Sequence, residues 1–284
     1  MAEDTHAGGA VGRTKALLSQ VHPVFMLPPL TASLFGAVVA GRVDPFGAAV
    51  HVTALFFAVY TAHVKDGYVD FHRRGEDDSH PLSARACRLA LVGSTAGFLT
   101  ALGALWVTAS PGAVALTAPT WALGYFHAPQ LDTHTVGATA GYPTGIALAL
   151  VGGYYVQTGG LSPAILGLAG VFLLFLAGIK IVDDAQDYGY DRSIDKQTVA
   201  VVLGKRAAHR AAYALMATGM VAVLLLVAGL PAIPPSATAA PLVFGVVALV
   251  ARRAEPELAT MLLIRGSYLF LAVLVGAVWF RPLG

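Results

Sequence analysis

Charged side chains are scarce in this sequence. Asp, Glu, Lys and Arg make up 12% of its 284 residues, whereas a soluble domain usually carries about 25%. Hydrophobic residues make up 56%, and the mean hydropathy is +0.69. Apolar runs recur from end to end, and a run of about 18 or more residues is long enough to cross the hydrocarbon core of a bilayer, which is about 30 Å thick. The composition therefore excludes an ordinary water-soluble domain and predicts an integral membrane protein.

Cysteine and signs of processing are also nearly absent. Cys87 is the only cysteine, which excludes an intrachain disulfide and a metal cage of thiolates. The net charge is only +2, and Lys and Arg stand at the ends of apolar runs, where membrane topology explains them. We therefore predict no nucleic-acid partner, and no obligatory protein partner is evident.

Residues 1–20 lack the separate apolar region and cleavage site of a signal peptide, so we expect the first helix to remain as an anchor.

The apolar runs predict an all-α membrane fold of about nine transmembrane helices in one bundle, with residues 1–284 forming a single domain. Of the 18 Lys and Arg residues, 15 fall on the side shared by the N-terminus and the connections after the second, sixth and eighth spans. Because cytoplasmic loops are enriched in Lys and Arg, we expect segment 1–20 in the cytoplasm and the C-terminus outside. The expected spans are 22–41, 46–64, 86–109, 112–128, 136–157, 161–182, 207–230, 236–251 and 258–280.

Two polar connections, 65–85 and 183–206, hold ten of the 16 acidic residues, and we expect both to be cytoplasmic active-site loops. Carboxylates three, four or seven positions apart on a helical end project from one face. Like charges at such spacings destabilise a helix by about 0.2–0.5 kcal/mol per pair, unless a cation lies between them. Mg²⁺ takes carboxylate and phosphate oxygens, so the pattern predicts Mg²⁺ bound together with a diphosphate. The candidate metal ligands are Asp66, Asp70, Asp184, Asp187 and Asp191, with Asp77 as a further candidate.

Basic residues are interleaved with these carboxylates and would balance the charge of a bound anion. The candidates for diphosphate contact are Lys65, Arg73, Arg74 and Lys196. Lys180 ends the sixth span and either reaches the diphosphate or extends to the membrane interface. An acidic loop that is merely solvated is the competing interpretation. Two acidic sets, each at the end of an even-numbered span and each followed by a basic cluster, favour the metal site.

The second acidic segment resembles a motif of the UbiA superfamily of intramembrane prenyltransferases, which carry Asp-x2-Asp-x3-Asp after the sixth helix. The matching residues are Asp184-Ala-Gln-Asp187-Tyr-Gly-Tyr-Asp191. The stretch that usually follows this motif in the superfamily is similar to Lys196-Gln-Thr-Val-Ala-Val-Val-Leu-Gly204. The resemblance covers nearly the whole chain.

The first acidic segment departs from the superfamily pattern. Asp66 stands where the family usually has Asn, Gly67 stands where Asp is common, and a third acid comes only at residues 76–78. This late spacing is closest to the 1,4-dihydroxy-2-naphthoate polyprenyltransferases of the menaquinone pathway, as is Tyr154-Tyr-Val-Gln-Thr-Gly159. The Arg-Gly-Leu-Gly-Glu stretch of that branch is missing from the sequence.

The resemblance implies helices around a central cavity that opens to the cytosol at the acidic loops and sideways to membrane lipid. It implies Mg²⁺-dependent transfer of a polyprenyl group from an isoprenyl diphosphate to a small lipophilic acceptor at the cell membrane, such as an aromatic quinone precursor. A glycerol phosphate ether lipid or a carotenoid would be served by the same metal site. A cation-coupled transporter is the alternative of another class, but its acidic residues are expected near mid-membrane.

Aromatic side chains near the acidic loops are candidates for the carbocation and acceptor pocket. The face of an aromatic ring attracts a cation by about 0.5–2 kcal/mol. Aromatic residues also gather at membrane interfaces, which explains any one of them equally well. A histidine beside the acceptor could take its proton. The candidates are Tyr125, Phe126, Tyr142 and His127.

Overall fold

The computed structural model describes residues 10–281, so the predicted segment 1–20 is described only from Ala10 onward. All regular elements within residues 10–281 are helical. The first part of the chain forms α1 (Ala10–Leu18), α2 (Pro23–Val39), α3 (Pro45–Val69), η1 (Asp70–Arg74), α4 (Ala84–Thr108), α5 (Pro111–Tyr125), η2 (His127–Leu131) and α6 (Thr135–Thr158). The second part forms α7 (Pro163–Asp184), α8 (Tyr188–Ser193), α9 (Val199–Leu203), α10 (Lys205–Gly229), η3 (Pro235–Thr238), α11 (Ala239–Ala251) and α12 (Pro256–Phe280).

Each predicted span coincides with one helix, in the order α2, α3, α4, α5, α6, α7, α10, α11 and α12. Within the described residues, 5 helices are long and apolar enough to cross a membrane: α3 with η1, α4, α7, α10 and α12. A sixth span arises if α1 and α2, which meet at a bend of 65°, are counted as one. Helices α5 and α11 are shorter, with 15 and 13 residues. An all-helical fold is confirmed, and membrane crossing by all nine predicted spans stays a prediction.

Helix starts are set by capping residues that stand just before a proline. Asp44 accepts hydrogen bonds from the backbone N–H groups of Phe46 and Gly47, and Ser110 and Ser162 cap α5 and α7 in the same way. Such side chains satisfy N–H groups that have no partner within the helix, and the following proline already has a helical φ.

The end of α5 is set by another proline. Ala128 precedes Pro129 and is extended, with φ −107° and ψ 136°, because a residue before proline disfavours the helical region. The predicted span 112–128 therefore stops at Tyr125 and gives way to a connection.

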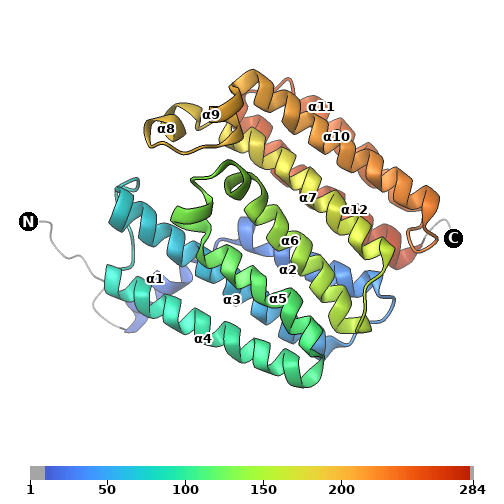
Figure 1. Ribbon diagram of the computed structural model, residues 1–284, viewed down its shortest axis with the longest axis horizontal. Coiled ribbons are helices and arrows are strands. Elements are labelled where there is room, and N and C mark those ends of the chain that lie inside the picture. The colour runs from blue at the N-terminus through green and yellow to red at the C-terminus, as the bar shows by residue number, and fades with distance from the viewer. Residues whose placement is uncertain (1–9, 282–284) are drawn as a thin grey trace, which may run out of the picture.

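The helices pack as neighbours around a core of apolar side chains (Figure 1). Helix α2 packs on α6, α3 on α4 and α5, α7 on α10, and α11 on α12. Helices α2 and α6 approach backbone to backbone, because a side chain at Gly36 or Gly153 would overlap backbone atoms of the opposite helix. Phe35, Phe172, Phe175, Phe244 and Phe270 form a buried aromatic cluster. Helices α8 and α9 lie at the end of the bundle away from the last residues of α12.

Candidate active site

A cavity of about 380 Å³ lies between α2, α3, α5, α6, α7 and α12. Asp66 from the last turns of α3 lines it, and so do Lys180 and Asp183 from the last turns of α7. The rest of the wall is mostly apolar and includes Leu55 and Leu176. The two acidic segments, more than 100 positions apart in the sequence, therefore meet at one end of a cavity that is otherwise suited to an apolar molecule.

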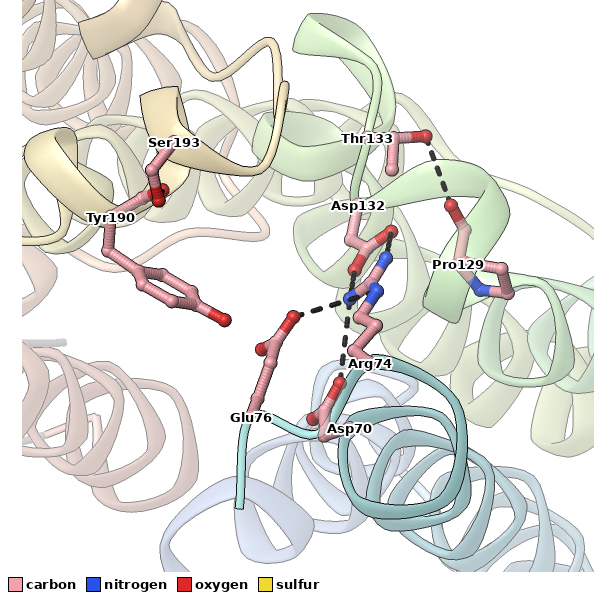
Figure 2. Close-up of polar contacts among 8 residues, drawn as sticks. All are labelled: Asp70, Arg74, Glu76, Pro129, Asp132, Thr133, Tyr190 and Ser193. Atoms are coloured by element: carbon pink, nitrogen blue, oxygen red, sulfur yellow. Dashed lines mark hydrogen bonds and ion pairs between the residues drawn. The ribbon is translucent and has the colours of Figure 1, made fainter.

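Arg74 holds carboxylates from two connections at this end (Figure 2). Its guanidinium forms two hydrogen bonds with Asp132, with Nη1–Oδ2 at 2.7 Å and Nη2–Oδ1 at 3.1 Å. Asp70 and Glu76 lie farther away, at 3.5 Å and 3.6 Å from the nearest guanidinium nitrogen. The connection after α3 is thereby tied to the connection that precedes α6.

The connection after α7 is tied to the same place. The backbone N–H of Gln197 donates to the carbonyl of Thr133 at 3.2 Å, and the Thr135 hydroxyl donates to the carbonyl of Gln197 at 2.5 Å. Tyr190 of α8 points toward Glu76 (Figure 2). We call these three connections, residues 70–83, 126–134 and 185–204, the polar cap. The cap joins all three segments beside the charged end of the cavity.

The second acidic segment is not one continuous helix. Helix α7 ends at Asp184, a turn follows, and α8 begins at Tyr188, so the expectation that Asp184, Asp187 and Asp191 share one helical face is wrong. Asp187 lines a separate groove with Lys205 of α10. Asp184 and Asp187 are still close enough to Asp191 for their charges to act on its carboxyl group.

Two of these aspartates are buried, Asp184 with 6% and Asp191 with 4% of its surface exposed. Lys180 Nζ lies 2.5 Å from Asp184 Oδ1 and 3.0 Å from Asp183 Oδ2, whereas Asp184 Oδ2 is buried without a hydrogen-bond partner. Burial raises the pKa of Asp191, and the positive charge of Lys196 opposes this effect. A cation beside these carboxylates would remove the cost of burying their charge.

The four predicted diphosphate contacts occupy different surroundings. The Lys65 side chain is buried, with Nζ 4.5 Å from the centre of the Tyr125 ring. Arg73 is exposed over the ring of Tyr68, and Arg74 is paired as described above. Lys196 lies close enough to Asp66, Asp70 and Asp191 for electrostatic interaction. Of the four, Lys196 interacts electrostatically with carboxylates of both acidic segments.

Of the four residues predicted for the carbocation and acceptor pocket, two line the cavity and two do not. Tyr142 and His127 line the cavity, and the Tyr142 hydroxyl donates to the carbonyl of Phe25 at 3.0 Å. Tyr125 and Phe126 are not among the cavity-lining residues. Tyr125 stacks on Trp121 with ring centres 5.0 Å apart, and Phe126 is 45% exposed. Asp77 is exposed in the polar cap.

Two histidines that the sequence interpretation missed also line the cavity. His22 and His63 stack with ring centres 4.8 Å apart, and His63 Nε2 is buried without a hydrogen-bond partner. His63 lies three residues before Asp66, which places both on one face of α3, so helical spacing could have found it. Burial lowers the pKa of the nearby His127, and the charge of Lys180 adds to this effect.

Several solved structures share the fold of this chain. A UbiA homologue from Archaeoglobus fulgidus bound to GPP and Mg²⁺ has a TM-score of 0.69 and 17% identity over 94% of this chain and 99% of that one. The apo UbiA homologue from Aeropyrum pernix K1 has a TM-score of 0.70 and 17% identity, over 92% and 98%. A digeranylgeranylglyceryl phosphate synthase has a TM-score of 0.73 and 15% identity, over 94% and 99%.

Comparison with curated proteins found no match. The family model of the UbiA prenyltransferases matches residues 26–274, which is most of the chain and includes both acidic segments and most of the residues that line the cavity. The protein therefore belongs to the UbiA prenyltransferase family.

Proposed function

We propose that this protein transfers a polyprenyl group from an isoprenyl diphosphate to a small lipophilic acceptor and releases diphosphate. The observation that carries the proposal is the cavity, which joins carboxylates of both acidic segments at one end to an apolar interior. An isoprenyl diphosphate has the same division, because its charged head and its hydrocarbon tail need opposite environments. Family membership and the neighbour bound to GPP and Mg²⁺ support this assignment.

The carboxylates of the two segments suit Mg²⁺, which prefers oxygen ligands and shares them with phosphate groups. The unpartnered buried oxygen of Asp184 also fits a cation. Bound Mg²⁺ would act as a Lewis acid that neutralises charge on the departing diphosphate. The residues proposed to hold it are Asp66, Asp70, Asp184, Asp187 and Asp191, with the exposed Asp77 as an outer candidate.

Cations of the chain would bind the diphosphate beside the metal. Lys180 lines the cavity and Lys196 interacts electrostatically with carboxylates of both acidic segments, so these two are best placed. Arg74 would position Asp70 and contribute positive charge from within its ion pairs. Lys65 and Arg73 stay candidates that would have to turn away from the rings they now contact.

Transfer breaks the bond between C1 of the isoprenyl group and the diphosphate oxygen, and forms a bond from C1 to the acceptor. Tyr142, which lines the cavity, would stabilise the allylic cation through its ring. The acceptor gives up one proton as the new bond forms. His63 and His127 line the same cavity and are proposed to receive it, because burial lowers the pKa of His127 and so favours the neutral imidazole, which has a lone pair free to accept a proton.

We propose an aromatic quinone precursor as the acceptor, on the resemblance to the naphthoate branch. A glycerol phosphate ether lipid is the second candidate, supported by the fold shared with digeranylgeranylglyceryl phosphate synthase. A carotenoid would use the same donor chemistry. The identity of the product distinguishes the three.

We propose that the chain forms one domain with nine membrane spans, an N-terminus in the cytoplasm and an active site on that side. The coincidence of the predicted spans with helices supports this topology. So does the gathering of 15 of the 18 Lys and Arg residues on one side.

The test is transfer of radiolabelled geranylgeranyl diphosphate by purified protein into a mixed acceptor extract, with Mg²⁺ or with EDTA. We expect a labelled lipid only with Mg²⁺, and a loss of rate of about 100-fold or more in Asp66→Ala. Asp66→Asn keeps an oxygen ligand and should lose less. Asp195→Asn is the matched control, because Asp195 is an exposed carboxylate of the same cap.

Transfer that persists in EDTA would contradict the metal site. If no donor length or acceptor gives a product and the diphosphate does not bind, the prenyltransferase proposal fails. Ion flux in liposomes would then test the cation-coupled transporter.

A further inference from the structure

A second cluster of metal-ligating side chains lies in the connection between α3 and α4 and at the start of α4. His72 comes from η1, His80 from the connection that follows, and Cys87 from the first turn of α4. One ligand atom from each residue lies within 4.8 Å of the other two. The three residues are eight and seven positions apart in the sequence, and they meet because the connection folds back between α3 and α4.

All three ligand atoms converge on one backbone carbonyl, that of Leu82. His72 Nε2 lies 3.1 Å from this oxygen, His80 Nδ1 lies 3.0 Å from it, and Cys87 Sγ lies 3.8 Å from it. The backbone N–H of Leu82 lies 3.2 Å from His80 Nδ1. Nδ1 accepts that hydrogen bond only when it carries no proton, and in that form it cannot donate to the carbonyl. A metal ion would replace these contacts with Leu82, and the two imidazole nitrogens and the buried thiol already surround the same carbonyl.

The rings are held in these positions by their neighbours. Phe71 contacts both imidazoles, with ring centres 4.8 Å from His72 and 5.9 Å from His80. His80 also lies directly against Gly67, where any side chain would collide with its Nε2 atom. Cys87 is completely buried. Because these side chains are already held in place, they would lose little conformational entropy when an ion binds, and this favours binding.

Two imidazole nitrogens and one thiolate form a donor set for Zn²⁺, whereas Mg²⁺ prefers oxygen. Tetrahedral zinc, with Zn–N near 2.0 Å and Zn–S near 2.3 Å, places its ligand atoms about 3.3–3.6 Å apart. His80 Nδ1 and Cys87 Sγ are 4.0 Å apart and all three ligand atoms lie within 4.8 Å of one another, so binding needs the side chains to move inward by about 1 Å. We propose that His72, His80 and Cys87 form a zinc site, with water as the fourth ligand.

The ion would fasten the connection 75–83 to the helices on either side of it. This connection follows Asp70 and Arg74 directly, and its His80 ring packs on Gly67, the residue next to Asp66. Zinc at this place would be a structural ion that holds the first acidic segment in position. The site itself depends only on the three ligands and is independent of the proposed function.

Co²⁺ is a suitable optical probe, because binding to a thiolate gives a charge-transfer band and tetrahedral geometry gives intense visible bands. The protein is stripped with chelator and titrated with Co²⁺ in excess Mg²⁺, which occupies oxygen sites. We expect one Co²⁺ per chain with a thiolate band, and displacement of Co²⁺ by Zn²⁺, since Zn²⁺ is the stronger binder.

Cys87→Ser and Cys87→Ala should abolish the thiolate band, and His80→Gln should weaken Zn²⁺ binding by about tenfold or more. His209→Gln is the matched control, because His209 is exposed on α10 and donates to the carbonyl of Lys205. Circular dichroism of each metal-free variant checks that it folds. A Co²⁺ spectrum without a thiolate band, or equal Zn²⁺ affinity in Cys87→Ala, would overturn the proposal.

Discussion

The ion pair between Arg74 and Asp132 joins two connections of the polar cap, and a double-mutant cycle can measure its strength. The two hydrogen bonds of this pair, at 2.7 and 3.1 Å, are shorter than the contacts of Arg74 with Asp70 and Glu76. The two side chains are 18% and 15% exposed, so water screens them less than it screens a surface pair. Paired hydrogen bonds between charged groups are also stronger than neutral ones.

A hydrogen bond to a charged group contributes about 1.5–3 kcal/mol in net free energy. Asp70 and Glu76 would retain part of the pairing after Asp132 is changed, so we expect a coupling energy of about 1–3 kcal/mol. The cycle needs Arg74→Gln, Asp132→Asn and the double variant. The free energy of unfolding is measured by SDS titration in mixed micelles, with the fluorescence of the 3 tryptophans as the signal.

Arg73 provides the control for this cycle, because it is exposed and its guanidinium lies 5.6 Å from the centre of the Tyr68 ring. Arg73→Gln combined with Asp132→Asn should show a coupling energy below about 0.5 kcal/mol. An equally small coupling energy between Arg74 and Asp132 would mean that their pair contributes no more than an exposed ion pair. The inference that the pair fastens the polar cap would then be refuted.

Three further predictions concern the helices and the cavity. Gly153→Ala should lower the free energy of unfolding in the SDS titration by about 1–3 kcal/mol, because the added methyl group overlaps the backbone of α2; an unchanged value would contradict the close approach. Because the pKa of His127 is lowered in the folded state, stability should fall as the pH drops below about 6.5, by at most about 1.4 kcal/mol per pH unit. His127→Gln should flatten that profile, and an unaltered profile would assign it to other groups. Tyr142→Leu should lower kcat by about 2–30-fold, whereas Tyr142→Phe keeps the ring; equal losses in transfer assays would exclude a role for the ring.

The helix positions could be predicted from the sequence because long apolar runs leave little choice of structure. The ends were harder to place. The second predicted span stops at residue 64, but α3 continues through Val69 and η1 through Arg74. Charged residues end an apolar run without ending a helix, since Lys and Arg are good helix formers. The apolar run therefore gave a span that ends too early, whereas the four-residue spacing of Asp66 and Asp70 correctly indicated that both lie on a helical end.

The meeting of the two acidic segments was predicted from their pattern of acidic and basic residues and from the family resemblance, but their detailed placement was not. Spacing within one helix cannot show that a turn separates Asp184 from Asp191, or that Arg74 pairs with a residue 58 positions away. Such contacts are decided by how connections fold over the bundle. The cluster of His72, His80 and Cys87 was not predicted either, because its sequence spacing matches no common zinc motif.

The division of the cavity into a charged end and an apolar interior lets the two halves of a substrate be varied separately. Under the proposed function, recognition of the head would depend on Asp66, Lys180 and Asp183, whereas the room for the tail would depend on side chains such as Leu55 and Ile146. Changes in the size of these apolar residues would alter the length of chain accepted without disturbing the machinery that releases the diphosphate. If the chain acts as proposed, the length of the accepted tail would be set by a small number of apolar side chains in the helices.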